Sequence, residues 1–426
     1  MNNRDGRMSN VEAWIRHGSE MRRPLLVTDD VSSSEKIVIV GGGLSGLCCA
    51  YRIAKKRPDI HVFLVEKAPH LGGVISTWKS GEWVCDLAVN ATRPHPAFWR
   101  LVSDLGLSSQ FHASRSRAKS RWILLNGKKH RLSFLSLFKI GALKLRKGIK
   151  VARHGGASVS QLLPHRNIAD AMTLGIVNDT SQNVDADFLM PALTHFGEQP
   201  PIKASLLKKK INRSYPLFTP KRGTVASLDG GMQTLVDALQ QQLESMDNVS
   251  MTTGQEIESP QAAADMFDVP LHSVIWSAPG MIGGHESTEL SVFAVGYREA
   301  DVAKIPYGYG TLIPDASVPF SGILHESDLH HSQRAPEGHR LFRIMAPHSR
   351  WDGDESKIRD ALKHHLSDCE PVLFENLGKR KIPCYPPGYM QNVAKQQFEF
   401  NCVGWGVSGV SITHVVDEAE RICEKF

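Results

Sequence analysis

The chain has 426 residues, which is enough for two or three structural regions around a sizeable hydrophobic core. Hydrophobic residues make up 41% of it, its mean hydropathy is −0.23, and it has no run of 18 apolar residues, so we expect a globular protein that does not span a membrane. The formal net charge is +6, and the seven cysteines form no C-x-x-C pair, which favours a reducing, cytoplasmic location.

Residues 1–35 are polar and mixed in charge. They lack the apolar core of a secretory signal and the acid-free character of a mitochondrial presequence. We expect a disordered N-terminal tail. Two alternatives stay open. Residues 11–23 could form a short amphipathic helix, or the sequence could begin too early, with Met8 or Met21 as the natural first residue.

Residues 36–73 carry the signals of a nucleotide-binding βαβ unit. The apolar run 37–40 predicts a strand that is buried on both faces. Gly41, Gly43 and Gly46 then form G-x-G-x-x-G, which allows a tight turn, close approach of the main chain to a pyrophosphate and close helix packing. A helix over 44–56 directs its first N–H groups at the phosphates.

The second predicted strand, 61–65, ends just before Glu66, whose carboxylate is spaced to accept hydrogen bonds from a ribose. Gly72-Gly73 follow after a gap that is typical of FAD-binding proteins. We therefore predict FAD as the cofactor. The expected contacts in this stretch are Gly41, Gly42, Gly43, Leu44, Ser45, Gly46, Glu66, Lys67, Gly72, Gly73 and Val74.

A hairpin is predicted next, with strands 74–78 and 83–87. Here the sequence resembles the protoporphyrinogen oxidase branch of the flavin amine oxidase superfamily, in which E-x-x-x-x-x-GG-V-I-x-T precedes an acidic-Leu-Gly-Pro-Asn segment. Asp86, Leu87 and Asn90 keep that pattern, whereas Ala88-Val89 replace Gly-Pro. The motif S-L-D-G-G-M-Q-T-L, from Ser227, is the most specific match further along the chain.

The resemblance recurs along nearly the whole chain and implies an α/β fold, α+β overall. Its parts are an FAD-binding Rossmann-like two-dinucleotide fold, an antiparallel-sheet substrate domain and an inserted helical subdomain. The implied boundaries are 36–104, 218–285 and 396–426 for the FAD domain, 105–217 for the helical subdomain and 286–395 for the substrate domain. By motif, Ile257, Ala278, Val410 and Ser411 are further cofactor contacts.

Residues 105–169 contain 14 Lys and Arg and neither Asp nor Glu, so the rest of the chain is net acidic. Within this region, residues 132–156 place apolar and basic residues at helical spacing. Two interpretations stay open, which are a helix that caps the FAD domain with a solvated basic face and peripheral contact with an anionic membrane. Nucleic acid is disfavoured, since no stacking aromatics or binding motif accompany the charge. A homodimer also stays open.

The resemblance implies oxidation of protoporphyrinogen IX to protoporphyrin IX, with hydride transfer to the flavin and dioxygen as acceptor. We therefore expect no catalytic side chain. The 19 histidines show no H-E-x-x-H or comparable spacing, so we also expect no metal site. Four alternatives remain, which are coproporphyrinogen III as substrate, an amine oxidase, a desaturase, and a non-catalytic FAD-binding scaffold.

The implied substrate contacts complete the prediction. Gly175 aligns with a glycine whose carbonyl meets pyrrole N–H groups in the family, although residues 178–181 replace the family's A-G-D-P turn. Apolar walls are expected from Leu312, Ile323 and Met345, with ordinary core packing as the alternative for each. Asn90 falls where relatives carry a propionate-binding arginine, so either Asn90 or the nearby Arg93 is expected to meet a propionate.

Overall fold

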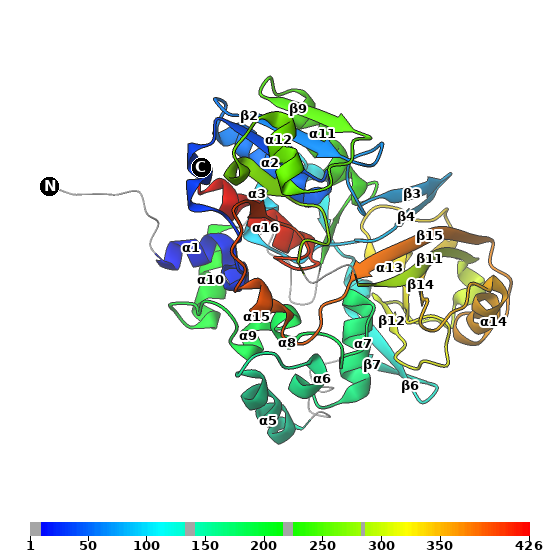
Figure 1. Cartoon of the computed structure of the whole chain (residues 1–426). Helices are drawn as coiled ribbons and strands as arrows, with labels where there is room; N and C mark the ends of the chain where they lie inside the picture. Colours follow the sequence, from blue (N-terminus) through cyan, green and yellow to red (C-terminus); the bar gives the residue numbers. More distant parts are fainter. Residues whose placement is uncertain (1–9, 133–140, 216–224, 283–285) are drawn as a thin grey trace.

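The computed structural model describes residues 10–132, 141–215, 225–282 and 286–426. Two sheets organise the molecule, with helices packed around them (Figure 1). The parallel sheet contains the first two strands of the chain, whereas the second sheet lies on the other side of the molecule beside α14.

The first sheet is fully parallel and has the strand order β16-β10-β1-β2-β9. Its strands are β1 (Lys36–Val40), β2 (His61–Glu66), β9 (Val249–Thr253), β10 (Val274–Trp276) and β16 (Asn401–Cys402). They come from three separate stretches of the chain, each of which falls within one of the three segments expected to build the FAD domain.

Side chains of β1 alternate between two helical layers, as the two-residue period of a strand requires. Ile37 and Ile39 pack on one face against α2 (Leu44–Lys56), α11 (Gln233–Glu244) and α16 (Ile412–Cys423). Val38 and Val40 pack on the other face against α12 (Pro260–Phe267). Helix α3 (Pro96–Asp104) joins the first layer. Because both faces are covered, the strands are continuously apolar.

The second sheet has seven strands in the order β15-β11-β14-β13-β12-β6-β7. They are β6 (Arg121–Leu125), β7 (Lys128–Leu132), β11 (Ser287–Arg298), β12 (Gly310–Leu312), β13 (Gly322–Leu324), β14 (His339–Pro347) and β15 (Leu373–Pro383). All neighbours are antiparallel except β12 and β6. Since β6 and β7 belong to this sheet, the predicted helical subdomain starts after residue 132 and not at 105.

Helix α14 (Glu355–His365) covers one face of the second sheet with Ile358 and Leu362. Two separate two-stranded antiparallel sheets pair β3 (Thr77–Ser80) with β4 (Trp83–Asp86) and β5 (Phe111–Ala113) with β8 (Ala226–Leu228). Helix α13 (Glu326–Leu329) packs on β14.

The helical region contains α5 (Ala142–Ala152), α6 (Val159–Leu162), α7 (Arg166–Val177), α8 (Ala186–Leu189), α9 (Pro191–Thr194) and α10 (Ala204–Ser214). Helix α15 (Tyr389–Val393) packs into the same core. Part of the predicted basic helix, residues 133–140, lies outside the described residues. Across the ranges that the structure describes, none of the helices combines the length and the apolar character needed to cross a membrane.

The prediction of a disordered tail over 1–35 is wrong for residues 10–35. Helix α1 (Asn10–His17) forms, as the amphipathic pattern suggested, and it buries Trp14 and His17. Leu26 forms a bridge with Cys402. The polar composition suggested disorder, but the buried polar groups of this segment pair with charged residues on α16, as described below.

Candidate cofactor and substrate site

The glycine turn after β1 forms a cradle at the C-terminal edge of the parallel sheet. Gly41 has φ +108° and Gly46 lies so close to it that a Cβ on Gly46 would stand 1.9 Å from the Gly41 carbonyl oxygen. Gly43 behaves differently. It has φ −71°, and an added Cβ would meet only the Cα of Gly73, at 4.0 Å. The space above Gly43 is therefore open, as close approach of a phosphate requires.

Gly72 and Gly73 form the second wall of the cradle. The Gly72 N–H donates to the Gly42 carbonyl oxygen at 2.8 Å, and both glycines have positive φ, +103° and +60°. A Cβ on Gly73 would stand 3.2 Å from the Gly43 Cα. Glycine at these positions therefore keeps the two walls close together while leaving the main chain accessible.

Glu66 ends β2 beside this cradle. Its carboxylate accepts the Gly42 N–H at 2.6 Å and the Ala68 N–H at 2.8 Å. Each carboxylate oxygen retains acceptor capacity for a further donor. The carboxylate is therefore fixed in position by the main chain and can meet ribose hydroxyls.

These features fit FAD. Helix α2 begins at Leu44 with no side-chain cap on Gly43, so its first N–H groups can meet an anion. Ser45 lies beside the loop that precedes α16, since a Cβ on Gly404 would stand 3.2 Å from the Ser45 hydroxyl oxygen. Bound FAD would be held by this cradle, Glu66 and the start of α2.

The remaining predicted cofactor contacts differ in how they lie relative to the cradle. Ala278 abuts the glycine turn, with its N–H nitrogen 3.0 Å from where a Gly41 Cβ would stand. Val410 and Ser411 precede α16, and Val410 lines the pocket described next. Ile257 is buried against α12. Lys67 is 71% exposed in its side chain and lies 3.7 Å from Glu256, so a cofactor role for Lys67 stays a prediction.

A pocket of about 140 Å³ lies between the dinucleotide-binding elements and the second sheet. Val74, residues 87–89, Trp405 and Val410 form the first wall. Across from them lie Gly175, Ile176 and Asn178 at the end of α7, and residues of β11, β14 and β15. A larger cavity, of about 690 Å³, is lined by residues that precede β1 and β10. It lies at the opposite edge of the parallel sheet, far from the glycine cradle.

Two predicted substrate residues, Gly175 and Met345, line the pocket of about 140 Å³. Leu312 lies beside them, since its Cδ2 stands 3.0 Å from where a Gly175 Cβ would be. Gly175 belongs to the last turn of α7, where main-chain carbonyls lack helical partners. The structure therefore brings these three residues together.

Three other predicted substrate contacts lie elsewhere. Ile323 is only 1% exposed and packs with Ile344 on the far face of the sheet, because neighbouring strand residues point to opposite faces. Arg93 points away, with its guanidinium 2.9 Å from His414 Nε2 and 3.8 Å from Glu20. Asn90 is buried and does not line the pocket. Sequence alignment alone did not reveal these orientations.

Sequence reasoning missed Asn178 and Arg380 as pocket residues. Asn178 ends α7 in the left-handed region, with φ 57°, which favours Asn over most residues. Its Nδ2 donates to the Glu289 carbonyl oxygen at 3.2 Å. This bond fixes the orientation of the amide, and the buried Oδ1 has no hydrogen-bond partner among the described residues. The departure from the family turn at 178 was the available signal.

Arg380 on β15 brings a cation to the same pocket. Its Nη1 donates to the Lys379 carbonyl oxygen at 2.8 Å, and its buried Nε has no partner within the described ranges. Burial and then the neighbouring Arg343 lower the pKa of Arg380. None of the described carboxylates forms an ion pair with this guanidinium.

Arg343 also lines the pocket, but its charge is already paired. Its Nε lies 3.0 Å from Glu326, and its Nη1 donates to the carbonyl oxygens of Asp86 and Ala88. Burial alone would raise the pKa of Glu326, but Arg343 and His330 lower the pKa to about 2. Arg343 therefore fixes the loop 86–89 that forms one pocket wall.

The parallel sheet and its glycine cradle define a dinucleotide-binding fold whose residues fit FAD. A family model for the NAD(P)-binding Rossmann-like domain matches residues 39–105. Among solved structures, reduced UDP-galactopyranose mutase superposes with a TM-score of 0.62 and 15% identity, covering 91% of this chain and 93% of that one. A proposed protoporphyrinogen oxidase from Exiguobacterium sp. 255-15 gives 0.62 and 14% identity, covering 92% and 98%.

Several curated proteins that this chain resembles are porphyrinogen oxidases. Coproporphyrinogen III oxidase of Bacillus subtilis (strain 168) is 23% identical over 411 residues, which cover 82% of this chain and 85% of the relative. The chloroplastic protoporphyrinogen oxidase 1 of Arabidopsis thaliana is 33% identical over 120 residues, covering 26% and 22%.

Proposed function

We propose that this protein oxidises a porphyrinogen, a reduced tetrapyrrole, by hydride transfer to bound FAD. The pocket between the two sheets carries the proposal, because it joins elements of the dinucleotide-binding domain to two hydrogen-bond acceptors and a cation on the opposite wall. Bound FAD would supply the two-electron acceptor, with dioxygen reduced to peroxide on its reoxidation. The chain itself must position the macrocycle and exclude water.

Pyrrole N–H groups need acceptors inside an apolar pocket. The Gly175 carbonyl and the Asn178 Oδ1 are two such acceptors at the end of one helix. A buried acceptor without a partner costs about 1–3 kcal/mol. A bound pyrrole would remove that cost, so we assign the recognition of the macrocycle centre to these two atoms.

Carboxylate side chains of the substrate need cations at the pocket wall. Arg380 is a half-buried cation that forms no ion pair with a carboxylate among the described residues, whereas Lys381 lies nearby with its Nζ 3.2 Å from Glu289. We assign one substrate propionate to Arg380. This replaces the expected role of Arg93.

Coproporphyrinogen III is a second candidate substrate. It carries four propionates where protoporphyrinogen IX carries two, so it needs more cations. Arg380 and Lys381 both line the pocket, whereas the sequence analysis expected only Asn90 or Arg93 to meet a propionate. Their presence, and the coproporphyrinogen III oxidase that matches along most of its length, favour coproporphyrinogen as much as protoporphyrinogen.

The pocket is smaller than the roughly 300–1,000 Å³ of ordinary ligand sites. At about 140 Å³ it cannot enclose a macrocycle as it stands. We infer that α7 and β15 move apart when the substrate enters. Asn178 and Arg380 lie on these two elements, so substrate contacts would form as the pocket opens.

Anaerobic mixing of the FAD-loaded protein with each porphyrinogen tests the proposal. Bleaching of the flavin absorbance near 450 nm is the expected result. An unchanged spectrum with both substrates would leave only a cofactor-binding scaffold. Asn178→Leu should slow bleaching at least tenfold, since it removes the acceptor and leaves the pyrrole N–H unpaired. Asp179→Leu, one residue further along, is the matched control.

Steady-state kcat/KM on both porphyrinogens, measured for Arg380→Leu, tests the cation. Loss of a charge-assisted hydrogen bond costs about 1.5–3 kcal/mol, so kcat/KM should fall roughly tenfold to a hundredfold. Lys379→Leu removes an equal charge from the exposed side of the same strand and should have little effect. Equal losses in the two variants would mean that only long-range charge matters. The ratio of the two kcat/KM values of the wild type decides between the substrates.

Peripheral membrane contact is a further proposal for α5. Leu143 on this helix is 80% exposed, and Lys144, Arg146, Lys147 and Lys150 surround it. Anionic vesicles should therefore bind the protein, and binding should fall with salt because the surface potential is screened. Leu143→Ser should weaken binding and Ser32→Ala should not. Absent or salt-independent binding would support a helix that only caps the FAD domain. A homodimer stays a prediction.

A further inference from the structure

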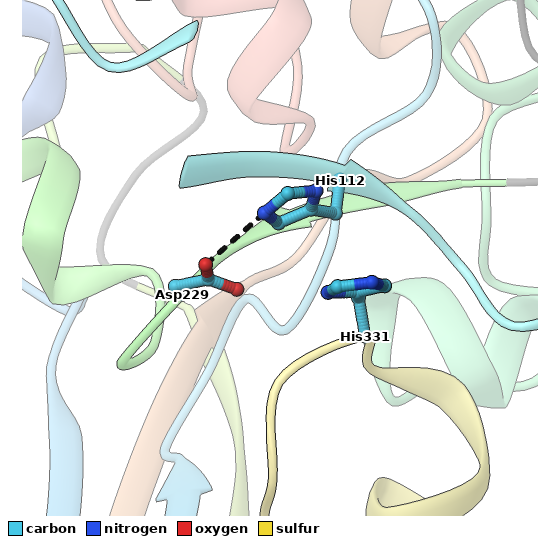
Figure 2. Close-up of side chains that lie close together, drawn as sticks. All are labelled: His112, Asp229 and His331. Carbon is cyan, nitrogen blue, oxygen red and sulfur yellow. Dashed lines mark hydrogen bonds and ion pairs between the residues drawn. The ribbon is translucent and has the colours of Figure 1, made fainter. Parts of the chain in front are cut away.

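We infer that His112, Asp229 and His331 form a binding site for a divalent transition-metal ion, with Zn²⁺ as the best-suited ion. Figure 2 shows the three side chains converging from separate segments of the chain. His112 lies in β5, Asp229 follows β8, and His331 follows α13. One ligand atom from each lies within 4.8 Å of those of the other two.

The donor set fits such an ion. Two imidazoles and one carboxylate are ligands that Zn²⁺ and related ions accept, with further positions left for water. Ligand atoms about 2 Å from one ion lie within about 4 Å of one another. The present separations therefore need only small side-chain rotations to close around an ion.

The main chain already fixes the three positions. His112 pairs with Ser227 in the β5–β8 ladder, and the Asp229 N–H donates to the Gln110 carbonyl oxygen at 2.9 Å. The carbonyl oxygen of His331 accepts from Arg115 Nη2 at 3.0 Å. Binding therefore orders few additional torsions, which favours affinity.

The side chains of this cluster are accessible to solvent. His112 and Asp229 have side chains that are 29% and 38% exposed, so an ion can enter from solvent. His112 Nε2 lies 3.1 Å from Asp229 Oδ2, and the rings of His112 and His331 stack with their centroids 4.2 Å apart. In the described part of the chain, neither Lys nor Arg forms an ion pair with Asp229.

A neighbouring cluster of Asp86, Glu326 and His330 has similar ligand types but does not favour a metal. Arg334 lies 3.2 Å from Asp86, and Arg343 lies 3.0 Å from Glu326. Both carboxylates are thus already compensated by buried guanidinium groups, and a divalent ion would have to displace them. The accessible cluster is the better site.

A bound ion would connect three segments that are far apart in sequence. Asp229 begins the turn into α11 of the dinucleotide-binding domain, whereas His331 belongs to the substrate-domain segment between β13 and β14. An ion that binds only the folded state stabilises it in proportion to its affinity and concentration. The site would therefore hold the two domains together, independently of the proposed reaction.

Calorimetric titration of the chelator-treated, FAD-loaded protein with Zn²⁺ tests this site. We expect one tight site in the wild type. Asp229→Asn and His331→Ala should each weaken it by at least about tenfold, since even second-shell changes cost that much. His154→Ala, at an exposed histidine outside the cluster, is the control and should bind like the wild type.

Thermal unfolding with and without Zn²⁺ gives a second readout. Zn²⁺ should raise the Tm of the wild type and of His154→Ala, but not of Asp229→Asn or His331→Ala. Retained flavin and an unchanged zinc-free Tm will show that the variants fold. If His331→Ala binds Zn²⁺ as tightly as the wild type, then His112 and Asp229 form only an ordinary ion pair and the proposal is wrong.

Discussion

The His17 imidazole lies 2.9 Å from the carboxylate of Asp417, and both side chains are almost fully buried. This contact joins α1 to the middle of α16, which packs on α2 behind the glycine cradle. The other ring nitrogen of His17 lies 3.2 Å from Glu424. The N-terminal segment therefore supports a helix of the cofactor-binding domain.

Replacing His17 tests this support. Removing one partner of a buried, hydrogen-bonded charge pair typically costs about 3–5 kcal/mol, because the remaining charge stays desolvated. His17→Ala should lower the free energy of unfolding by that order, as measured by urea denaturation. Ser32→Ala, at an exposed position in the same segment, should stay within about 0.5 kcal/mol of the wild type. Equal stabilities for both variants would mean that the segment is only loosely attached.

Gly43 and Gly46 should respond differently to a side chain. Gly43→Val places its side chain in the open cradle, so the variant should fold but lose FAD. Gly46→Val forces a clash with the Gly41 carbonyl and should lower stability as well. Flavin absorbance after gel filtration and the Tm of the apoprotein separate the two effects. Full flavin occupancy in Gly43→Val would contradict the cofactor assignment.

Glu66→Gln should weaken FAD binding without abolishing it. The change removes one charge-assisted acceptor for a ribose hydroxyl, which is worth roughly 1.5–3 kcal/mol. The dissociation constant of FAD, measured by fluorescence titration, should rise roughly tenfold to a hundredfold. Lys67→Gln, at the exposed neighbouring side chain, should leave it nearly unchanged, and a similar rise there would show that Lys67 contacts the cofactor.

Glu418 should make stability depend on pH. Burial raises the pKa of this carboxyl to about 8, although its hydrogen bond from the Gly404 N–H acts in the other direction. A raised folded-state pKa favours the protonated form, so the contribution of Glu418 is complete below about pH 4.5 and is lost as pH rises through about 8.

Glu418→Gln keeps an acceptor for the Gly404 N–H and cannot ionise. Its Tm should therefore fall less than that of the wild type between pH 5 and pH 9. Asp265→Asn, at an exposed position of α12, provides a carboxylate control. If the Tm of the wild type and of Glu418→Gln changed with pH in the same way, a group other than Glu418 would cause the pH dependence.

The dinucleotide-binding half could be predicted closely because its signals are local. The helix predicted over 44–56 is α2, and the strands around it agree within a residue. Glycine positions set the backbone of the turn directly. The sequence neighbours of Gly41, Gly43 and Gly46 were therefore enough to place the cradle.

The substrate wall was harder because it is built from side-chain directions on distant strands. Ile323 and Leu312 look alike in sequence, but strand register turns one into the core and the other toward Gly175. Arg93 and Arg380 are both plausible propionate partners until Glu20 is seen beside Arg93. The metal-site prediction searched for ligands close in sequence, whereas His112, Asp229 and His331 meet only through the fold.

The cofactor-binding domain also has an order of synthesis. The glycine cradle, between β1 and residue 73, is synthesised early. Helix α16, which packs on α2, is synthesised only after the helical region and the second sheet. Until then, α2 lacks a layer of its core and the loop around Gly404 that abuts Ser45. The nascent chain should therefore capture FAD only after α16 has docked on α2, so cofactor uptake should follow synthesis of the other two segments of the domain.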